Sequence, residues 1–198
     1  VAIFYAGIKL IYPILSLLLI ALASPFFWTL LKPYQQNRVM IFLNPDLDPL
    51  GKGYHIIQSK IAIGSGGMRG NGFLGGSQSS LDFLPEKETD FVFAIFSEQF
   101  GFTGSMVILG LFLFLFLIPI FKSFFLTQVF NKLILFVLSF KIFFEFLINI
   151  SMTIGLVPVV GVALPFMSYG GSSLLSNMII CALLINIMSI SEKKRMFS

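Results

Sequence analysis

The chain has 198 residues, of which 57% are hydrophobic and only 11% are charged, and its formal net charge is +4. Soluble domains carry about 25% charged residues, so this composition excludes an ordinary soluble protein and indicates an integral membrane protein. The small positive charge is explained by membrane topology and gives no support to nucleic-acid binding. Cys181 is the only cysteine and His55 the only histidine, which excludes an internal disulfide and argues against a His/Cys zinc site.

Apolar runs of about 20 residues are long enough to cross a membrane as helices. We therefore predict an all-α, polytopic membrane fold that forms one unit over residues 1–198. The predicted spans are 8–31, 91–120, 133–156 and 166–190, with one long loop at 32–90. The chain starts at Val1 in apolar sequence without the features of a signal peptide. We expect it to be the later part of a longer protein.

The short basic segments of the chain fall on one side of this four-span arrangement. They are Lys9, the connection 121–132 and the tail 192–195. Positively charged short flanks stay in the cytoplasm, so we predict a multi-pass protein of the bacterial inner membrane with a cytoplasmic C-terminus. The loop 32–90 and the connection 157–165 then face outward.

The long loop contains a predicted short helix at residues 56–63, followed by a glycine-rich run at 64–72. Gly70, Gly72 and Gly75 have the spacing of a dinucleotide-binding fingerprint, but no strand precedes them. A backbone with unusual angles or a close approach is the favoured explanation. A backbone cradle for a phosphate is the functional alternative.

Four carboxylates gather at the end of this loop: Asp82, Glu86, Glu88 and Asp90. Like charges and partial desolvation are expected to raise the pKa of Asp90, which suits a general base. The same carboxylates could instead hold Mg²⁺ or Mn²⁺ against a pyrophosphate. A third interpretation is an acidic helix start, with Thr89 or Asp90 as the N-cap. Spacing alone leaves all three open.

Two further groups are candidates for function. Lys141 and Glu145 lie four apart inside a predicted span, where ionisable groups either line a transport path or neutralise each other against a neighbouring helix. Gln58 and Lys60 in the loop are candidates for sugar or phosphate contacts, and a solvated helix face explains them nearly as well.

Long motifs of this chain resemble the SEDS family (shape, elongation, division and sporulation). The matching segments are residues 54–67, 83–91, Asn149, 155–162 and 166–173, and the resemblance covers essentially the whole chain. The sequence of residues 54–59 is most similar to that of the rod-shape branch of the family. Family members have more spans than this chain, and Glu88 stands where many of them carry histidine.

The resemblance implies a peptidoglycan glycosyltransferase that polymerises lipid II outside the cytoplasmic membrane during elongation and shape maintenance, together with a class B penicillin-binding transpeptidase. The essential aspartate of the family falls on Asp90, the implied catalytic residue. No organic cofactor is expected, and a divalent cation is a candidate, with Asp82, Glu86, Glu88 and Asp90 as its ligands. The candidate substrate-binding residues are Gln58, Lys60, Arg69, Asp82, Glu86, Lys87 and Thr89. The alternatives are a lipid II flippase that depends on Lys141 and Glu145, and an inactive scaffold for the transpeptidase.

Overall fold

The computed structural model describes residues 11–48, 51–73, 75–76 and 89–196, and this part of the chain forms helices and connections without any strand. The elements in chain order are α2 (Ile11–Leu30), α3 (Pro33–Leu43), the short 3-10 helix η1 (Pro45–Leu47), α4 (Lys52–Ser65), α6 (Val92–Phe124), α7 (Val129–Thr153) and α8 (Gly171–Met196). The all-α prediction is confirmed.

Three of these helices are long and apolar enough to cross a membrane: Val92–Phe124, Val129–Thr153 and Gly171–Ser189. The corresponding part of α2, Ile14–Ala23, is shorter. These helices support a multi-pass membrane protein. They overlap the four predicted spans, although α8 begins at Gly171, five residues after the predicted start at residue 166.

Aromatic rings join α6 to α7. Phe112 stacks on Phe146 and Phe116 stacks on Phe143, each with ring centroids 4.2 Å apart. Offset stacking of this kind adds about 0.5–1.5 kcal/mol to the burial of each pair. A second apolar cluster joins α8 to these two helices, and its buried members are Leu126, Leu135, Ile142, Ile180 and Leu184.

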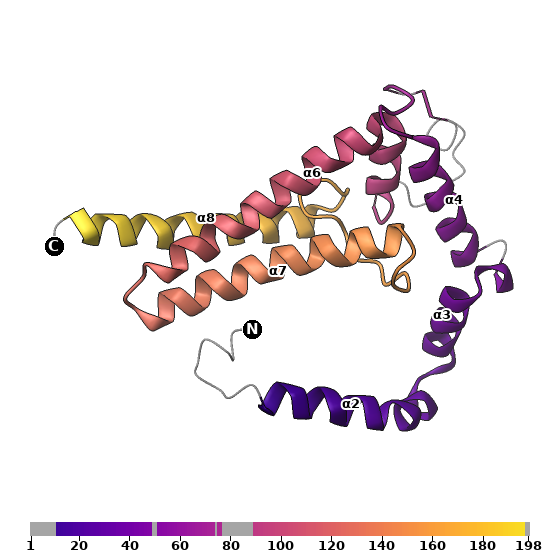
Figure 1. Cartoon of the computed structure of the whole chain (residues 1–198), viewed down its shortest axis with the longest axis horizontal. Helices are drawn as coiled ribbons and strands as arrows, with labels where there is room; N and C mark the ends of the chain where they lie inside the picture. The colour runs from indigo at the N-terminus through magenta and orange to yellow at the C-terminus, as the bar shows by residue number, and fades with distance from the viewer. Residues whose placement is uncertain (1–10, 49–50, 74, 77–88, 197–198) are drawn as a thin grey trace.

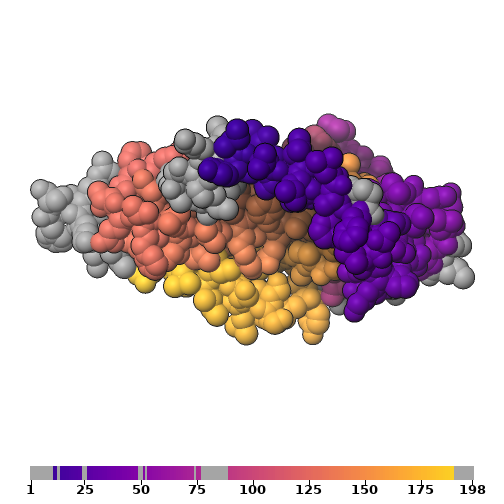
Figure 2. Space-filling model, turned by 90° about the horizontal axis from the view of Figure 1, so that it is seen from below, coloured from indigo at the N-terminus to yellow at the C-terminus, as the bar shows by residue number. Residues whose placement is uncertain are grey.

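The connections gather at the two ends of this bundle (Figure 1). The α6–α7 turn and the end of α8 lie at one end, while α4 and the connection 154–170 lie at the other. In the view of Figure 2, α8 runs along the edge of the molecule opposite α2. This grouping agrees with the predicted sidedness of the loops. Which end faces the cytoplasm stays a prediction.

Helix α6 is broken at Gly101, which has φ 66° and ψ −164°. The predicted continuous run 91–120 is therefore divided into a short helix at 92–100 and a long one at 102–124. The break is held by the glycine-rich run. Asn71 N and Gly72 N donate to the carbonyls of Glu98 and Gln99, and Phe102 N donates to Gly67 O at 2.8 Å.

We call residues 66–72 and 97–103 together the glycine junction. The two backbones lie so close that a Cβ on Gly70 would be 2.1 Å from Gln99 O, and one on Gly101 would be 2.3 Å from Gly70 N. Gly67, Gly70 and Gly72 all have positive φ. The favoured interpretation of this run is thus confirmed. Because the N–H groups of residues 70–72 donate to main-chain carbonyls, they do not form the alternative phosphate cradle.

Candidate functional site

Asp90 lies immediately before α6, where α4, α6 and α7 meet. The N-cap of α6 is Phe91, one residue after the later of the two predicted caps. The Phe91 side chain is fully buried in a cluster with Ile56 of α4 and Met152 of α7. This anchor leaves Asp90 half-buried beside it. The positive end of the helix dipole at this position favours a carboxylate.

The connection 154–170 runs beside the Asp90 side chain. A Cβ built on Gly161 would lie 3.5 Å from Asp90 Oδ2, so the carboxylate faces this glycine. Ser168 Oγ donates to Thr89 O and accepts from Leu164 N at 2.7 Å. Phe166 has φ 64°, which is rare for a bulky residue and marks a locally strained turn next to the site.

Asn149 ties Asp90 to this connection from inside the bundle. The side chain is fully buried near the end of α7. Its Nδ2 donates to Asp90 O at 3.0 Å and to Val162 O at 2.7 Å. Sequence reasoning included Asn149 in the family signature but did not identify it as a partner of Asp90.

Arg38 was missed by sequence reasoning. It belongs to α3, and its Nη1 donates to Val159 O of the connection at 3.3 Å. With Ile41, Ile56 and Val159 it lines a small pocket beside this contact. The contact spans 121 positions of the chain, so no local pattern could have indicated it.

Lys60 approaches the same connection from α4. Its ammonium lies against Gly155, where an added Cβ would be 2.6 Å from Nζ. The preceding residue, Ser59, is fully buried and donates to Thr153 O at 2.7 Å. Gln58 lies half-buried on the same helix. The structure thus brings Lys60 to the connection 154–170, six residues before Gly161, the glycine that faces Asp90.

Arg69 lies in the glycine junction, at the opposite end of the short helix 92–100 from Asp90. Nine residues at about 1.5 Å each separate these ends by about 13 Å. Thr89 contributes its main-chain carbonyl to the site. Four other predicted residues, Asp82, Glu86, Lys87 and Glu88, fall outside the described part of the chain.

The described residues do not provide a metal site. They contain no group of three or more His, Cys, Asp or Glu side chains that could hold an ion. Of the four predicted acidic ligands, Asp90 alone is described. Mg²⁺ is usually bound through one or two carboxylates together with waters and substrate phosphates. The cation stays a prediction that depends on the loop before Thr89.

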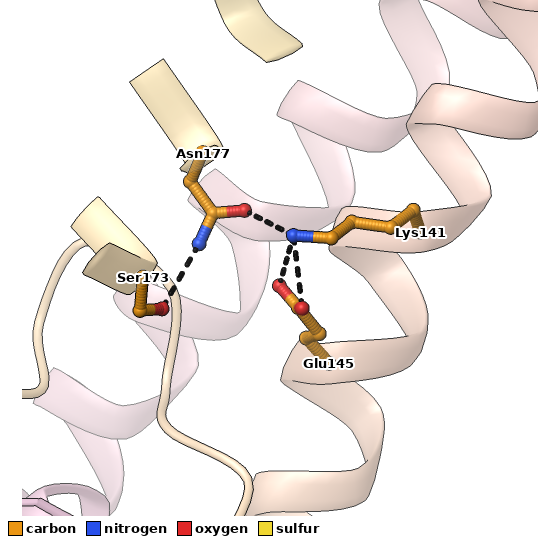
Figure 3. A network of polar contacts seen from close by, with 4 residues as sticks. All are labelled: Lys141, Glu145, Ser173 and Asn177. Atoms are coloured by element: carbon orange, nitrogen blue, oxygen red, sulfur yellow. Dashed lines mark hydrogen bonds and ion pairs between the residues drawn. The ribbon is translucent and has the colours of Figure 1, made fainter. Parts of the chain in front are cut away.

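Lys141 and Glu145 form a closed polar network with α8 (Figure 3). Lys141 Nζ lies 2.9 Å from both carboxylate oxygens of Glu145 and 2.9 Å from Asn177 Oδ1. Asn177 is fully buried and also donates to Ser173 Oγ at 3.4 Å. The pair therefore neutralises itself against a neighbouring helix, as one of the two interpretations expected.

Several known proteins are similar to this chain in sequence, and one solved structure is similar to it in fold. Residues 1–193 match the family of cell cycle proteins that groups FtsW, RodA and SpoVE. The peptidoglycan glycosyltransferase MrdB of Escherichia coli K12 is 44% identical over 92% of this chain and 49% of its own length. RodA of Treponema pallidum is 48% identical over 79% of this chain and 36% of its own length. Stage V sporulation protein E of Bacillus subtilis is 40% identical over 94% of this chain and 50% of its own length.

A chain of a solved peptidoglycan synthase complex, reported for its structural coordination of polymerization and crosslinking, has the same fold. The TM-score is 0.76 at 32% identity, and the match covers 96% of this chain and 52% of that one. The chain spans about half the length, or less, of the curated relatives it matches. Because the family match extends over residues 1–193, the chain belongs to the FtsW/RodA/SpoVE (SEDS) family of cell cycle proteins.

Proposed function

We propose that this chain carries the catalytic carboxylate of a peptidoglycan glycosyltransferase that polymerises lipid II. The observation that carries the proposal is the setting of Asp90. Its half-buried carboxylate faces Gly161, and its main chain is bonded to Asn149. A rigidly held carboxylate at the start of a helix is what a general base requires. The named activity of MrdB and RodA supports the same assignment.

In the proposed reaction, Asp90 takes the proton from the 4-hydroxyl of the acceptor sugar. The freed oxygen attacks the anomeric carbon of the donor and forms the new glycosidic bond. The bond from that carbon to the pyrophosphate oxygen breaks, and undecaprenyl pyrophosphate leaves with the electron pair. Attack from the face opposite the leaving group turns the α-linked donor into a β-1,4 linkage.

The leaving pyrophosphate gains negative charge during this step and needs a cation nearby. Lys60 is our candidate for that role, because its ammonium lies against the connection that runs beside Asp90. Arg69 and Lys87 remain further candidates. No step is assigned to a divalent cation.

We also propose that catalysis takes place on the outer face of the inner membrane and that the C-terminal end is cytoplasmic. A class B penicillin-binding transpeptidase is the proposed partner, which the similarity to a chain of a peptidoglycan synthase complex supports. The flippase alternative receives no specific support, because Lys141 pairs with Glu145 and also donates to Asn177 Oδ1.

Replacement of Asp90 by Asn in the protein that contains this chain tests the proposal. Asparagine keeps the shape of the side chain but cannot act as the base. Loss of glycan polymerisation with intact folding is the expected result.

A further inference from the structure

We infer that Asn149 and Ser168 are positioning residues that hold the Asp90 carboxylate against the connection 154–170. The inference rests on the proposed role of Asp90 as the general base. Both side chains act on main-chain carbonyls. Asn149 donates to the carbonyl of Asp90, and Ser168 donates to that of Thr89.

The chemistry of Asn149 suits this role. Its NH₂ group has two hydrogens, and each is donated to a main-chain carbonyl, one on Asp90 and one on Val162. Both partners are acceptors, so the amide must present its nitrogen to them. An aspartate here would place a carboxylate oxygen, an acceptor, next to two carbonyl acceptors. A glutamine side chain is longer by one methylene and would displace the amide from these two carbonyls. The site is fully buried, so these two bonds are shielded from bulk water.

The Asn149 amide therefore joins the main chain at Asp90 to the connection at Val162. Val162 follows Gly161, the residue whose backbone faces the Asp90 carboxylate. Ser168 makes a second link of the same kind, since it bonds Thr89 on one side and Leu164 on the other. The two side chains together fasten residues 89–90 to residues 162–164. A misplacement of about 1 Å at a reacting group can reduce a rate by about 100-fold.

The test uses Asn149→Ala, Asn149→Asp and Ser168→Ala in the protein that contains this chain, with lipid II as the substrate. Loss of positioning should lower kcat by about 10- to 100-fold and leave KM for lipid II within about threefold. Asn177→Ala and Ser139→Ala are matched controls. Each removes the same group from a fully buried site on α8 or α7 that does not contact residues 89–90, and each should keep the parental kcat.

A double variant separates positioning from a general structural role. Asp90→Glu already displaces the carboxylate, so the addition of Asn149→Ala to it should reduce kcat by a smaller factor than in the parental protein. If the reductions in kcat of the two single variants multiply fully in the double variant, the inference is overturned. If Asn149→Ala does not fold, Ser168→Ala, which removes a single hydroxyl, decides the question by the same kcat and KM criteria.

The possible failures are distinguishable. Parental kcat in both Asn149→Ala and Ser168→Ala, beside an inactive Asp90→Asn, would overturn this inference and leave the proposed function intact. An active Asp90→Asn would overturn the proposed function itself.

Discussion

The carboxylate of Asp90 faces Gly161, although the two residues are 71 positions apart: a Cβ on Gly161 would be 3.5 Å from Asp90 Oδ2. This distance leaves room for a methyl group. The φ of 76° at Gly161, however, lies in the left-handed region, which costs other residues about 1–2 kcal/mol. Glycine at this position therefore favours the observed shape of the connection beside the proposed catalytic carboxylate.

Gly161→Ala should reduce polymerisation and lower the free energy of unfolding by about 1–2 kcal/mol, because of backbone strain rather than steric clash. Activity and thermal unfolding in detergent measure the two effects. Gly171→Ala is the control, since Gly171 begins α8 with open space around it and no positive φ. Equal behaviour of the two variants would contradict the account of Gly161.

Substitutions in the glycine junction should destabilise the protein more than Gly161→Ala does. Gly70→Ala and Gly101→Ala each place a Cβ within 2.3 Å of backbone atoms on the other half of the junction. We expect a loss of about 2–4 kcal/mol in the free energy of unfolding, from overpacking and from backbone strain together. Denaturant titration of the purified protein measures it.

Gly64→Ala is the matched control for the junction. Gly64 lies inside α4, and an added Cβ there meets nothing within 4 Å. Alanine is the better helix former by up to about 1 kcal/mol, so this variant should be as stable as the parent or more so. A stable Gly101→Ala protein would show that the break in α6 does not depend on close approach.

The Lys141–Glu145 pair should be sensitive to the loss of one member alone. Lys141→Met leaves the Glu145 charge without its cation at a site where the two side chains are only 34% and 29% exposed. We expect destabilisation by about 2 kcal/mol, below the range for fully buried pairs because of this partial exposure. The double variant Lys141→Met/Glu145→Leu should recover most of the loss. Equal thermal stability of the single and double variants would contradict a self-neutralising pair.

Lys60 should contribute to the reaction through its charge. Lys60→Met keeps the length of the side chain but removes the ammonium, and kcat/KM for lipid II should fall by about 10- to 100-fold. Lys60→Arg should retain most of the activity. Lys122→Met removes a charge in the last turn of α6, at the other end of the bundle, and should have no effect. Parental activity in Lys60→Met would contradict the proposed role of Lys60 in the reaction.

Much of the fold could be predicted from the sequence, because long apolar runs have few alternatives to membrane helices. The break at Gly101 could not, since Phe100 and Phe102 continue the apolar run on both sides of it. The break is made by hydrogen bonds from residues about 30 positions earlier. The pattern of residue types along a helix predicts that helix, but it does not predict hydrogen bonds from the backbone of another segment.

The candidate site was predictable only in part. Asp90 could be identified by the family resemblance, whereas spacing alone left a base, a metal ligand and a helix cap open and slightly favoured the cap. Arg38 and Asn149 act through main-chain carbonyls that lie 121 and 59 positions away. Main-chain acceptors carry no side-chain signature, so these contacts could not be predicted from residue types and spacing.

The most direct test of the central claim is glycan polymer formation from lipid II by the Asp90→Asn variant, in the protein that contains this chain and in the presence of the proposed partner transpeptidase. Asp46→Asn is the control, because Asp46 is an exposed carboxylate on η1. The account predicts no polymer from Asp90→Asn, parental polymer from Asp46→Asn and equal thermal stability of both proteins. Polymer synthesis by a folded Asp90→Asn protein at the parental rate would contradict it.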